Sequence, residues 1–324
     1  MTAAAPPNRV DVAVGVVLRD DGAVLIGQRV AGKPYAGWWE FPGGKLEAGE
    51  SVEQALAREL HEELGLESVT STPWVVRGHV YPHATVRLFF RRVRRWRGEP
   101  QSREAQALVW RRADAVDVAP LLPAAIAPLA WLRLPPIYRI SCAGEIGVEA
   151  FERSLGRALE ALGDTGPGVA PLLLQLREPQ LPAAEFERLF DRLRILRDTR
   201  PLRLVVSSRH PRSYAEAADG VHLTARDLLA ARERPRGRWV GASCHHEADL
   251  QAAGALGCDF AVFGPVMPTP SHPGAPSLGF DGFAARTALT PIPVYALGGL
   301  SADALEAAEA AGAHGVALMR AAWR

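Results

Sequence analysis

Three glutamates with helical spacing are the residues of this sequence best suited to chemistry. Glu59, Glu62 and Glu63 are three and four positions apart, so a helix would place them on one face. Three crowded carboxylates repel one another unless a cation neutralises them, and oxygen ligands without Cys or His favour Mg²⁺ or Mn²⁺. The alternative is a solvated acidic helix face, but Gly44 and Gly65 bracket the segment. The sequence therefore predicts a site for a hard cation.

The same helix also has apolar faces. Ala55, Leu56, Leu60 and Leu64 fall on these other faces, where they can pack against a core. Packing of this kind would fix the direction in which the glutamates point.

The segment from Gly44 to Leu66 matches the Nudix box, G-x5-E-x7-R-E-U-x-E-E-x-G-U with U aliphatic, at every defined position. The resemblance implies a loop–helix–loop that holds Mg²⁺, with Mn²⁺ as the alternative, and hydrolyses a nucleoside diphosphate linked to another group. It also implies an ion pair between Arg58 and Glu50 that fixes the loop–helix geometry. The implied metal ligands are the backbone carbonyl of Gly43 and the carboxylates of Glu59, Glu62, Glu63 and Glu104. The same four glutamates are the candidate catalytic residues, with Glu104 as a further ligand or as the base.

Sequence outside the box narrows the resemblance to one branch of the family. The run from Trp96 to Pro100, followed by Glu104, is similar to MutT, the 8-oxo-dGTP diphosphatases, and the similarity covers roughly residues 9–132. In that branch water attacks the β-phosphorus and gives a nucleoside monophosphate and pyrophosphate. Positions that contact the substrate in MutT correspond here to Arg29, Glu40, Phe41, Pro42 and Gly43.

One position leaves the preferred substrate open. MutT reads the oxidised guanine with an Asn, and the corresponding residue here is expected to be Ala125, which has no amide. We expect 8-oxo-dGTP to be the best nucleotide, with a smaller margin over dGTP than a MutT with its Asn would show. One alternative is another diphosphate, such as damaged thiamine diphosphate. The other is that the second half of the chain senses a phosphorylated ligand.

Length, charge and cysteine content limit the other classes of protein. A chain of 324 residues is long enough for two domains. With 37 basic and 36 acidic residues the net charge is +1, so no direct DNA binding is expected. Three cysteines are too few for a disulfide framework or a zinc site, which fits a reducing cytoplasm. Neither a signal peptide nor a membrane span is expected from the apolar pattern, and the oligomeric state is left open.

The chain divides near Leu134-Pro135-Pro136, because two prolines cannot continue the helix that Leu122 to Trp131 predicts. We expect a Nudix domain over residues 1–133, a linker at 134–136 and a second domain over 137–324. The Nudix resemblance implies an α/β/α sandwich with a mixed sheet for the first domain.

The second domain alternates eight strand candidates with helices. This pattern predicts a (β/α)8 TIM-type barrel, and an open doubly wound sheet is the alternative. The strand candidates are Ile137–Ser141, Pro171–Leu176, Leu202–Ser207, Gly220–Leu223, Trp239–Ser243, Phe260–Phe263, Pro293–Leu297 and Gly315–Met319. Helical candidates include Gly147–Leu162, Pro182–Arg197, His246–Ala255 and Ala302–Ala311.

The ends of these strands resemble the thiamine-phosphate synthase/TenI family over about residues 137–322. In such a barrel the site lies at the carboxyl ends of the strands. Because glycines let the backbone approach a phosphate, we expect a phosphate site at Gly298, Gly299, Met319 and Arg320. Possible further ligand contacts are Arg177, Ser243, Thr269 and His272.

Several residues depart from the pattern of that family. Pro179 and His272 stand where the family has lysines, and Ser207-Ser208 replaces the Asn-Asp pair that holds Mg²⁺. Asp227 is the candidate for the second acidic metal position. Without these charges the departure of pyrophosphate loses electrostatic support. We therefore expect no thiamine-phosphate synthase activity, and either binding of a small phosphorylated ligand or a scaffold role.

Overall fold

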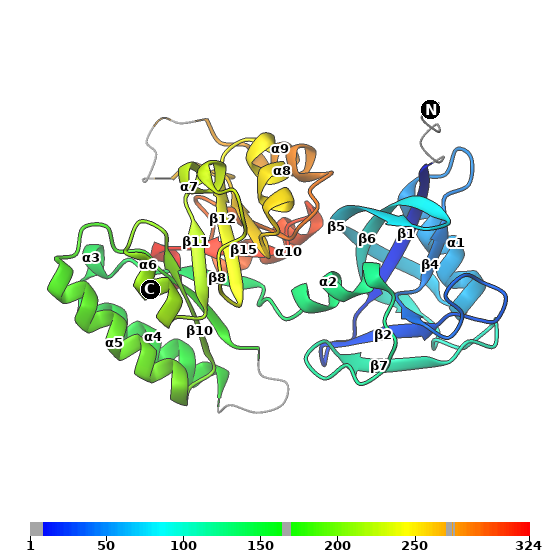
Figure 1. The fold of residues 1–324 in the computed structure, drawn as a ribbon, viewed down its shortest axis with the longest axis horizontal. Coiled ribbons are helices and arrows are strands. Elements are labelled where there is room, and N and C mark those ends of the chain that lie inside the picture. The colour runs from blue at the N-terminus through cyan, green and yellow to red at the C-terminus, as the bar shows by residue number, and fades with distance from the viewer. Residues whose placement is uncertain (1–8, 164–169, 270–273, 275) are drawn as a thin grey trace. The chain divides into compact units, whose positions relative to one another are not determined.

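The protein folds as two units, Met1–Arg133 and Leu134–Arg324. A computed structural model describes residues 9–163, 170–269, 274 and 276–324. Each unit has its own sheets and helices, which Figure 1 labels along the chain. None of the helices in these described ranges is long and apolar enough to span a membrane.

The first unit contains two sheets. One has the strand order β4-β1-β6-β5, and the other has the order β3-β2-β7. The β1–β6 pair is parallel and the other pairs are antiparallel, so the first sheet is mixed as expected. The strands are β1 (Arg9–Val17), β2 (Ala23–Gln28), β3 (Trp39–Glu40), β4 (Gly43–Lys45), β5 (Glu67–Tyr81), β6 (Ala84–Arg97) and β7 (Leu108–Arg112).

Helix α1 (Val52–Leu64) begins and ends at residues suited to those positions. The Ser51 side chain accepts a hydrogen bond from the Gln54 amide, and the Gln54 side chain accepts one from the Ser51 amide. This capping box satisfies two free donors of the first turn. Gly65 ends the helix in the left-handed conformation, at φ 72°. Helix α1 thus begins before the three predicted glutamates and ends directly after them.

The apolar face of α1 packs against β1, as the sequence predicts. Ala55, Leu56, Leu60 and Leu64 are all fully buried. Gly15 of β1 lies beneath them, and a Cβ atom there would be 3.1 Å from the Leu56 side chain. Burial of each leucine side chain stabilises the fold by roughly 2 kcal/mol. Rotation of α1 would expose these side chains, so the packing fixes which face of α1 lies toward β4.

The second unit is a closed barrel of parallel strands, in the order β8-β9-β10-β11-β12-β13-β14-β15 and back to β8. The barrel prediction is confirmed, and the open sheet is wrong. Each predicted strand is present, with ends that differ by at most one residue. The strands are β8 (Ile137–Ile140), β9 (Leu172–Leu176), β10 (Leu202–Ser207), β11 (Gly220–Leu223), β12 (Trp239–Cys244), β13 (Phe260–Phe263), β14 (Val294–Leu297) and β15 (Gly315–Leu318).

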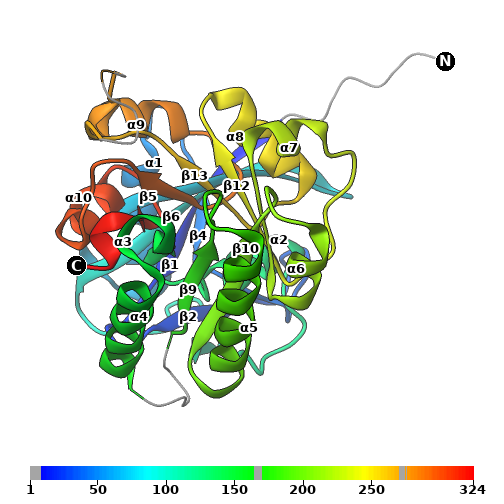
Figure 2. The same cartoon turned by 90° about the vertical axis from the view of Figure 1, so that its left-hand side faces the viewer.

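Helices pack on the outside of this barrel. Figure 2 shows α4 and α5 side by side, and their apolar faces share one core with β9 and β10. The predicted helix Ala302–Ala311 is split into a 3-10 turn and a short helix. The helices after α2 (Pro123–Trp131) of the first unit are α3 (Ala143–Ile146), α4 (Val148–Leu162), α5 (Ala183–Thr199), α6 (Arg212–Ala217), α7 (Ala225–Ala230), α8 (Glu247–Leu256), α9 (Gly279–Thr287), η1 (Ala302–Ala304), α10 (Leu305–Ala310) and η2 (Arg320–Ala322).

Candidate active site

Arg58 joins helix α1 to the loop that precedes it. Its guanidinium donates to both carboxylate oxygens of Glu50, at 2.8 and 2.9 Å, and to the carbonyl of Lys45 at 3.0 Å. The hydrogen bonds from Arg58 lower the pKa of Glu50 to about 2. Arg58 also donates to Glu59 at 2.9 Å and to Glu62 at 3.2 Å. The expected Arg58–Glu50 pair is thus present, and the same guanidinium neutralises two of the predicted metal ligands.

Two glycines let the loop before α1 approach the carboxylates. At Gly44 a Cβ atom would lie 2.1 Å from the carboxyl carbon of Glu59, so no larger residue fits. At Gly43 φ is 138°, and a Cβ atom would lie 2.2 Å from the carbonyl oxygen of Ala13. The Gly43 amide donates to the carboxylate of Glu63 at 3.3 Å. The two glycines therefore bring backbone directly against Glu59 and Glu63.

Glu63 lies on α1, and its side chain is partly buried against the loop that precedes the helix. Burial raises its pKa to about 7, and the charges of Glu104 and Glu59 act in the same direction. The Gly43 amide and the charge of Lys33 act in the opposite direction. Within the described part of the chain, Glu63 forms no ion pair. A desolvated carboxylate with one backbone donor is better suited to bind a cation than to stabilise the fold.

Glu104 is paired with Lys33, although the two residues are far apart in the sequence. The Nζ atom of Lys33 donates to Oε2 of Glu104 at 2.8 Å, and the side chains are 46% and 41% exposed. This hydrogen bond raises the pKa of Lys33. The Glu104 amide donates to the Gln106 side chain at 2.9 Å, and that side chain donates to the Glu63 carbonyl at 3.1 Å. Gln106 thus holds the Glu104 loop against the end of α1.

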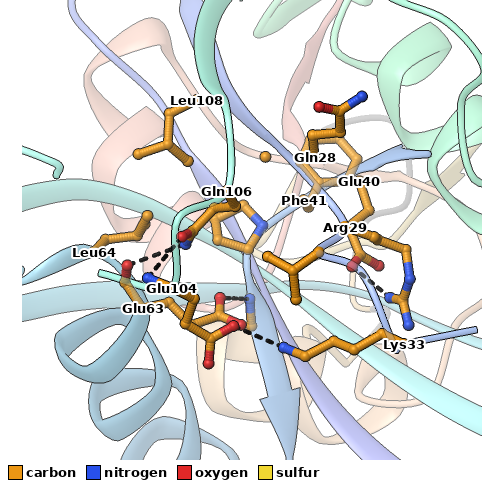
Figure 3. A pocket seen from close by; sticks show the side chains of 14 residues that line it. Gln28, Arg29, Lys33, Glu40, Phe41, Glu63, Leu64, Glu104, Gln106 and Leu108 are labelled. Carbon is orange, nitrogen blue, oxygen red and sulfur yellow. Dashed lines mark hydrogen bonds and ion pairs between the residues drawn. The ribbon is translucent and has the colours of Figure 1, made fainter. Parts of the chain in front are cut away.

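These groups line one pocket, which Figure 3 shows from close by. Glu63 and Glu104 line it, whereas Glu59 and Glu62 are not among its lining residues. The predicted substrate contacts all line it: Arg29, Glu40, Phe41, Pro42 and Gly43. Lining residues that sequence reasoning missed include Gln28, Lys33, Gln106 and Leu108. The available signal was that Lys33 is one of only two lysines in the chain.

Arg29 forms an ion pair at the pocket, and two tyrosines pack against each other nearby. The Arg29 guanidinium pairs with Glu40 and donates from Nε to the Pro34 carbonyl at 2.7 Å. Burial raises the pKa of Glu40, and the charge of Arg29 opposes that rise. The ring of Tyr35 lies 5.4 Å from that of Tyr81, which is close enough to Arg29 and Glu40 to interact with their charges. Tyr35 and Tyr81 are not among the lining residues of the pocket, whose charged groups lie beside Phe41.

The expected convergence of Glu59, Glu62 and Glu63 is not seen. Glu62 is 57% exposed, and Arg58 draws it and Glu59 aside because one guanidinium satisfies both carboxylates. Accordingly, over residues 9–163, 170–269, 274 and 276–324, no group of three Asp, Glu, His or Cys residues is arranged to hold a metal ion. The donor set nevertheless fits a hard cation. It consists of oxygen atoms only, which are the ligands that Mg²⁺ prefers.

Ala125 does not occupy a position from which it can read a base. It lies on α2 with 3% of its surface exposed, within the core. Its neighbours on α2 instead line a second pocket together with strand residues, namely Arg77, Gly78, His79, Leu88, Pro123, Ala124, Ile126 and Ala127. Ala125 is also not among the residues that line the pocket of Figure 3. That Ala125 corresponds to the Asn of MutT stays a prediction.

A buried hydrogen-bonded chain crosses the interior of the barrel. The Tyr138 hydroxyl lies 3.0 Å from Nδ1 of His222, and Nε2 of His222 lies 3.0 Å from the Ser243 hydroxyl. Burial lowers the pKa of His222 to about 3, so its ring is neutral at pH 7. Ser243, one of the expected ligand contacts, is therefore already bonded inside the barrel.

The expected metal position of the barrel is occupied by hydroxyl groups. The Ser208 hydroxyl donates to Oδ2 of Asp227 at 2.5 Å, and the Thr224 hydroxyl donates to the same oxygen at 2.7 Å. Arg177 follows β9, and burial together with the charge of Arg209 lowers its pKa. This mouth of the barrel thus carries two guanidinium groups and a carboxylate that is already hydrogen-bonded.

The glycines of the expected phosphate site have a packing explanation. A Cβ atom at Gly298 would lie 2.6 Å from the Pro265 side chain, and one at Gly299 would lie 2.4 Å from the Pro268 carbonyl oxygen. Close approach of the loop after β13 therefore requires both glycines without any ligand. The Gly298-Gly299 pair is therefore explained by backbone packing alone.

The other residues expected near that site lie in different surroundings. Arg320 donates to both carboxylate oxygens of Glu145, at 2.6 and 3.0 Å, so its charge is already paired. Met319 directly precedes η2. Thr269 is the last described residue before the gap after β13, and His272 lies outside the described residues.

Comparison with known proteins relates each unit to a different family. Residues 9–132 match the NUDIX domain, and residues 137–322 match thiamine monophosphate synthase. An 8-oxo-dGTP diphosphatase of Haemophilus influenzae is 38% identical over 115 residues, which are 36% of this chain and 85% of that protein. A CTP pyrophosphohydrolase of Escherichia coli is 39% identical over 113 residues, covering 35% and 84%. A thiamine-phosphate synthase of Gloeobacter violaceus is 37% identical over 153 residues, covering 46% and 45%.

Proposed function

The chain belongs to the Nudix hydrolases through residues 9–132 and to the thiamine monophosphate synthase family through residues 137–322, and from this membership we propose that its first unit is a Mg²⁺-dependent 8-oxo-dGTP diphosphatase. It converts 8-oxo-dGTP into 8-oxo-dGMP and pyrophosphate. The pocket of Figure 3 supports this proposal most, because carboxylates and cationic side chains line one space. The similarity to the Haemophilus influenzae enzyme supports the choice of nucleotide.

We assign the residues of the pocket to three roles in hydrolysis: phosphate binding, metal binding and proton transfer. Arg29 and Lys33 provide positive charge for the phosphates, since phosphoryl transfer depends mainly on positioning and charge stabilisation. Glu63 and Glu104, with Glu59 and the Gly43 carbonyl beside them, are the proposed ligands for Mg²⁺. A bound Mg²⁺ ion would neutralise phosphate charge and lower the pKa of water. Glu104 is also the proposed proton acceptor, because its half-exposed carboxylate can reach solvent.

A substrate screen tests the proposal. The purified protein with Mg²⁺ is assayed against 8-oxo-dGTP, dGTP, CTP and thiamine diphosphate analogues, with pyrophosphate and phosphate measured separately. We expect the highest kcat/KM for 8-oxo-dGTP and release of pyrophosphate. The margin over dGTP should be small, because no Asn amide stands at Ala125 to read the oxidised base. Because Ala125 is buried, an Ala125→Asn substitution should lower stability without widening the margin. A higher kcat/KM for CTP than for 8-oxo-dGTP would contradict the choice of nucleotide.

A second candidate substrate is a thiamine-type diphosphate. The observation that favours it is the fusion of the Nudix unit to a thiamine monophosphate synthase unit in one chain. A hydrolase acting on damaged thiamine diphosphate would then act beside a barrel that binds related compounds. The screen separates the two candidates, because this one requires that thiamine diphosphate analogues exceed both guanine nucleotides in kcat/KM.

For the barrel, we propose loss of thiamine-phosphate synthase activity and retention of a weak phosphate site at Gly298-Gly299 and Met319-Arg320. Hydrogen bonding at Asp227, the candidate metal ligand, supports the loss of activity. Its Oδ2 atom accepts hydrogen bonds from the hydroxyl groups of Ser208 and Thr224. Glu145 would compete with phosphate for Arg320, because its carboxylate already pairs with that guanidinium. A barrel of this kind binds a phosphorylated ligand as a sensor or serves as a scaffold.

Two experiments test the proposal for the barrel. The gene should fail to restore thiamine-independent growth in a strain without thiamine-phosphate synthase, and growth would contradict the loss of activity. Inorganic phosphate should bind weakly to the full chain and more tightly to a Glu145→Gln variant, because the carboxylate that competes with phosphate for Arg320 is then neutral. Equal phosphate affinity in the wild type and the variant would argue against a site that includes Arg320.

A further inference from the structure

Lysine is rare in this chain, and one of its lysines lies in the Nudix pocket. Of the 37 basic residues, only Lys33 and Lys45 are lysines. Lys33 lies in the loop between β2 and β3, and its side chain lines the pocket together with Glu63 and Glu104. A pocket lysine in a chain that otherwise uses arginine suggests that a small, mobile charge is needed there.

The Lys33 side chain extends toward the acidic wall of the pocket, as Figure 3 shows. Its Nζ atom bonds to Glu104 at 2.8 Å. The charge of Lys33 also acts on Glu63 and on Glu40. A single ammonium group therefore counters the negative charge of three pocket carboxylates. This is the neutralisation that a divalent cation would supply to Glu63 and Glu104.

The Lys33–Glu104 pair is poorly suited to a structural role. Both side chains are close to half exposed, and exposed ion pairs contribute little to stability. The Glu104 loop is held instead by Gln106, through hydrogen bonds from the Glu104 amide and to the Glu63 carbonyl. The ion pair can therefore open while the loop keeps its position.

We propose that Lys33 exchanges Glu104 for the phosphates of the substrate when a divalent cation binds to the glutamates. This inference rests on the proposed function of the same pocket. Before the exchange, Lys33 competes with the cation for Glu104. After it, the released ammonium group is left beside the pocket and pairs with the anionic phosphate chain that enters. Lys33 thus couples loading of the cation to binding of the substrate.

The choice of lysine over arginine follows from this exchange. An ammonium group forms single, interchangeable hydrogen bonds, whereas a guanidinium can hold a carboxylate by two parallel bonds. Arg58 holds Glu50 in that two-bond manner in the same unit. An arginine at position 33 would therefore hold Glu104 more firmly and oppose release.

Substitution at position 33 should separate cation affinity from substrate affinity. In Lys33→Met, binding of Mn²⁺ without nucleotide should tighten by about 3- to 10-fold, because the competing charge is gone. The KM for 8-oxo-dGTP should rise by about 5- to 10-fold with kcat within about 2-fold, because a ground-state phosphate contact is lost. In Lys33→Arg, Mn²⁺ binding should weaken. A purely structural Lys33 would weaken both cation and substrate binding in Lys33→Met.

Arg111→Met is the matched control for loss of one positive charge. Arg111 pairs with Asp117 in the same unit, and it is not among the lining residues of the pocket. Its Mn²⁺ affinity and KM should stay at the wild-type values. If Arg111→Met reproduced the changes of Lys33→Met, the effect would be one of net charge and the inference would be wrong.

The two lysines also permit a direct observation of the exchange. Selective isotope labelling of lysine gives one side-chain NMR signal for Lys33 and one for Lys45, and Lys33→Met assigns them. Mg²⁺ alone should move the Lys33 signal toward that of an unpaired lysine, and subsequent addition of pyrophosphate should move it again. A Lys33 signal that ignores Mg²⁺ while the cation binds elsewhere in the unit would overturn the exchange.

These measurements distinguish the inference from the proposed function. Mn²⁺ affinity and the NMR signal need no turnover, so they test Lys33 even if the nucleotide is wrongly chosen. Turnover of 8-oxo-dGTP with unchanged Mn²⁺ affinity in Lys33→Met would refute the inference and leave the proposed function standing. The opposite result, tighter Mn²⁺ binding without nucleotide turnover, would support Lys33 as the competing cation and reject 8-oxo-dGTP as substrate.

Discussion

At the scale of single residues, the site is a set of four carboxylates held by three partners. Arg58 bonds to Glu59 and Glu62, the Gly43 amide bonds to Glu63, and Lys33 bonds to Glu104. Only Glu63 lacks a cationic side chain at bonding distance in the ranges that the structure describes. Its raised pKa follows from burial without such a partner. Glu63 is therefore the residue whose charge most needs a bound cation.

Replacing Glu63 by Gln should remove most of the activity and leave the fold intact. The amide keeps the size of the carboxylate but cannot neutralise a cation, so kcat should fall by on the order of 10²-fold or more. Glu53→Gln is the control, because Glu53 lies on the same helix with a 64% exposed side chain paired to Arg91. Turnover and thermal unfolding are measured for both variants. Near-wild-type turnover in Glu63→Gln would remove Glu63 from the proposed ligands.

At the scale of elements, the site depends on the junction between β4 and α1. Packing against β1 fixes the helix, and Arg58 ties the preceding loop to it through Glu50 and the Lys45 carbonyl. The two glycines of β4 then bring the strand against the carboxylates. The segment acts as one structural piece, and so a change at the junction should affect the whole carboxylate set.

Arg58→Lys should weaken this junction without removing its charge. One ammonium group cannot replace guanidinium bonds to Glu50, Glu59 and the Lys45 carbonyl together. We expect kcat to fall by about 10-fold or more and the unfolding midpoint to drop by a few degrees, as for a loss of about 1–2 kcal/mol. Arg111→Lys, at a surface pair of the same unit, should change neither quantity. Equal activity in both variants would show that the junction is not needed.

The barrel interior should make the second unit sensitive to acid. Burial lowers the pKa of His222 to about 3, below the value of 6.5 expected in an unfolded chain. The unfolded state therefore takes up a proton that the folded state refuses, so stability is full above pH 6.5 and falls as the pH drops from 6.5 toward 3. His222→Gln should lose less stability between pH 7.5 and pH 5 in urea unfolding. An identical loss in both proteins would show that His222 stays protonated or solvated.

At the scale of the whole molecule, two families are joined in one chain. The described contacts assign the Nudix pocket entirely to residues of the first unit, and the barrel closes with strands of the second unit alone. Each unit also has its own hydrophobic core. Hydrolysis should therefore not require the barrel for its chemistry.

A fragment of residues 1–133 should keep the diphosphatase activity. Its kcat and KM should lie within about 3-fold of those of the full chain, because all proposed ligands and substrate contacts belong to it. The isolated barrel should show no hydrolysis. The measurement is Mg²⁺-dependent release of pyrophosphate at equal protein concentration, with circular dichroism to check that the fragment is folded. A folded but inactive fragment would mean that the barrel contributes to the site.

Features that depend on local pattern can be predicted from the amino-acid sequence. The helical period placed Ala55, Leu56, Leu60 and Leu64 inward, and the alternation of apolar runs with helices predicted all eight barrel strands. The spacing of glycines and glutamates also gave the Nudix match. Local backbone geometry and burial fix these features within a few turns of chain, so one sequence suffices to find them.

Contacts between residues far apart in the sequence became visible in the folded structure. The Lys33–Glu104 pair joins residues 71 positions apart, and Gln106 reaches back across 43 positions to Glu63. The burial of Ala125 and the close approach of Pro265 and Pro268 to Gly298 and Gly299 likewise depend on how separate elements pack. No periodicity encodes such contacts, because they arise when chain folding brings side chains of unrelated segments into one volume and each charge takes the nearest available partner.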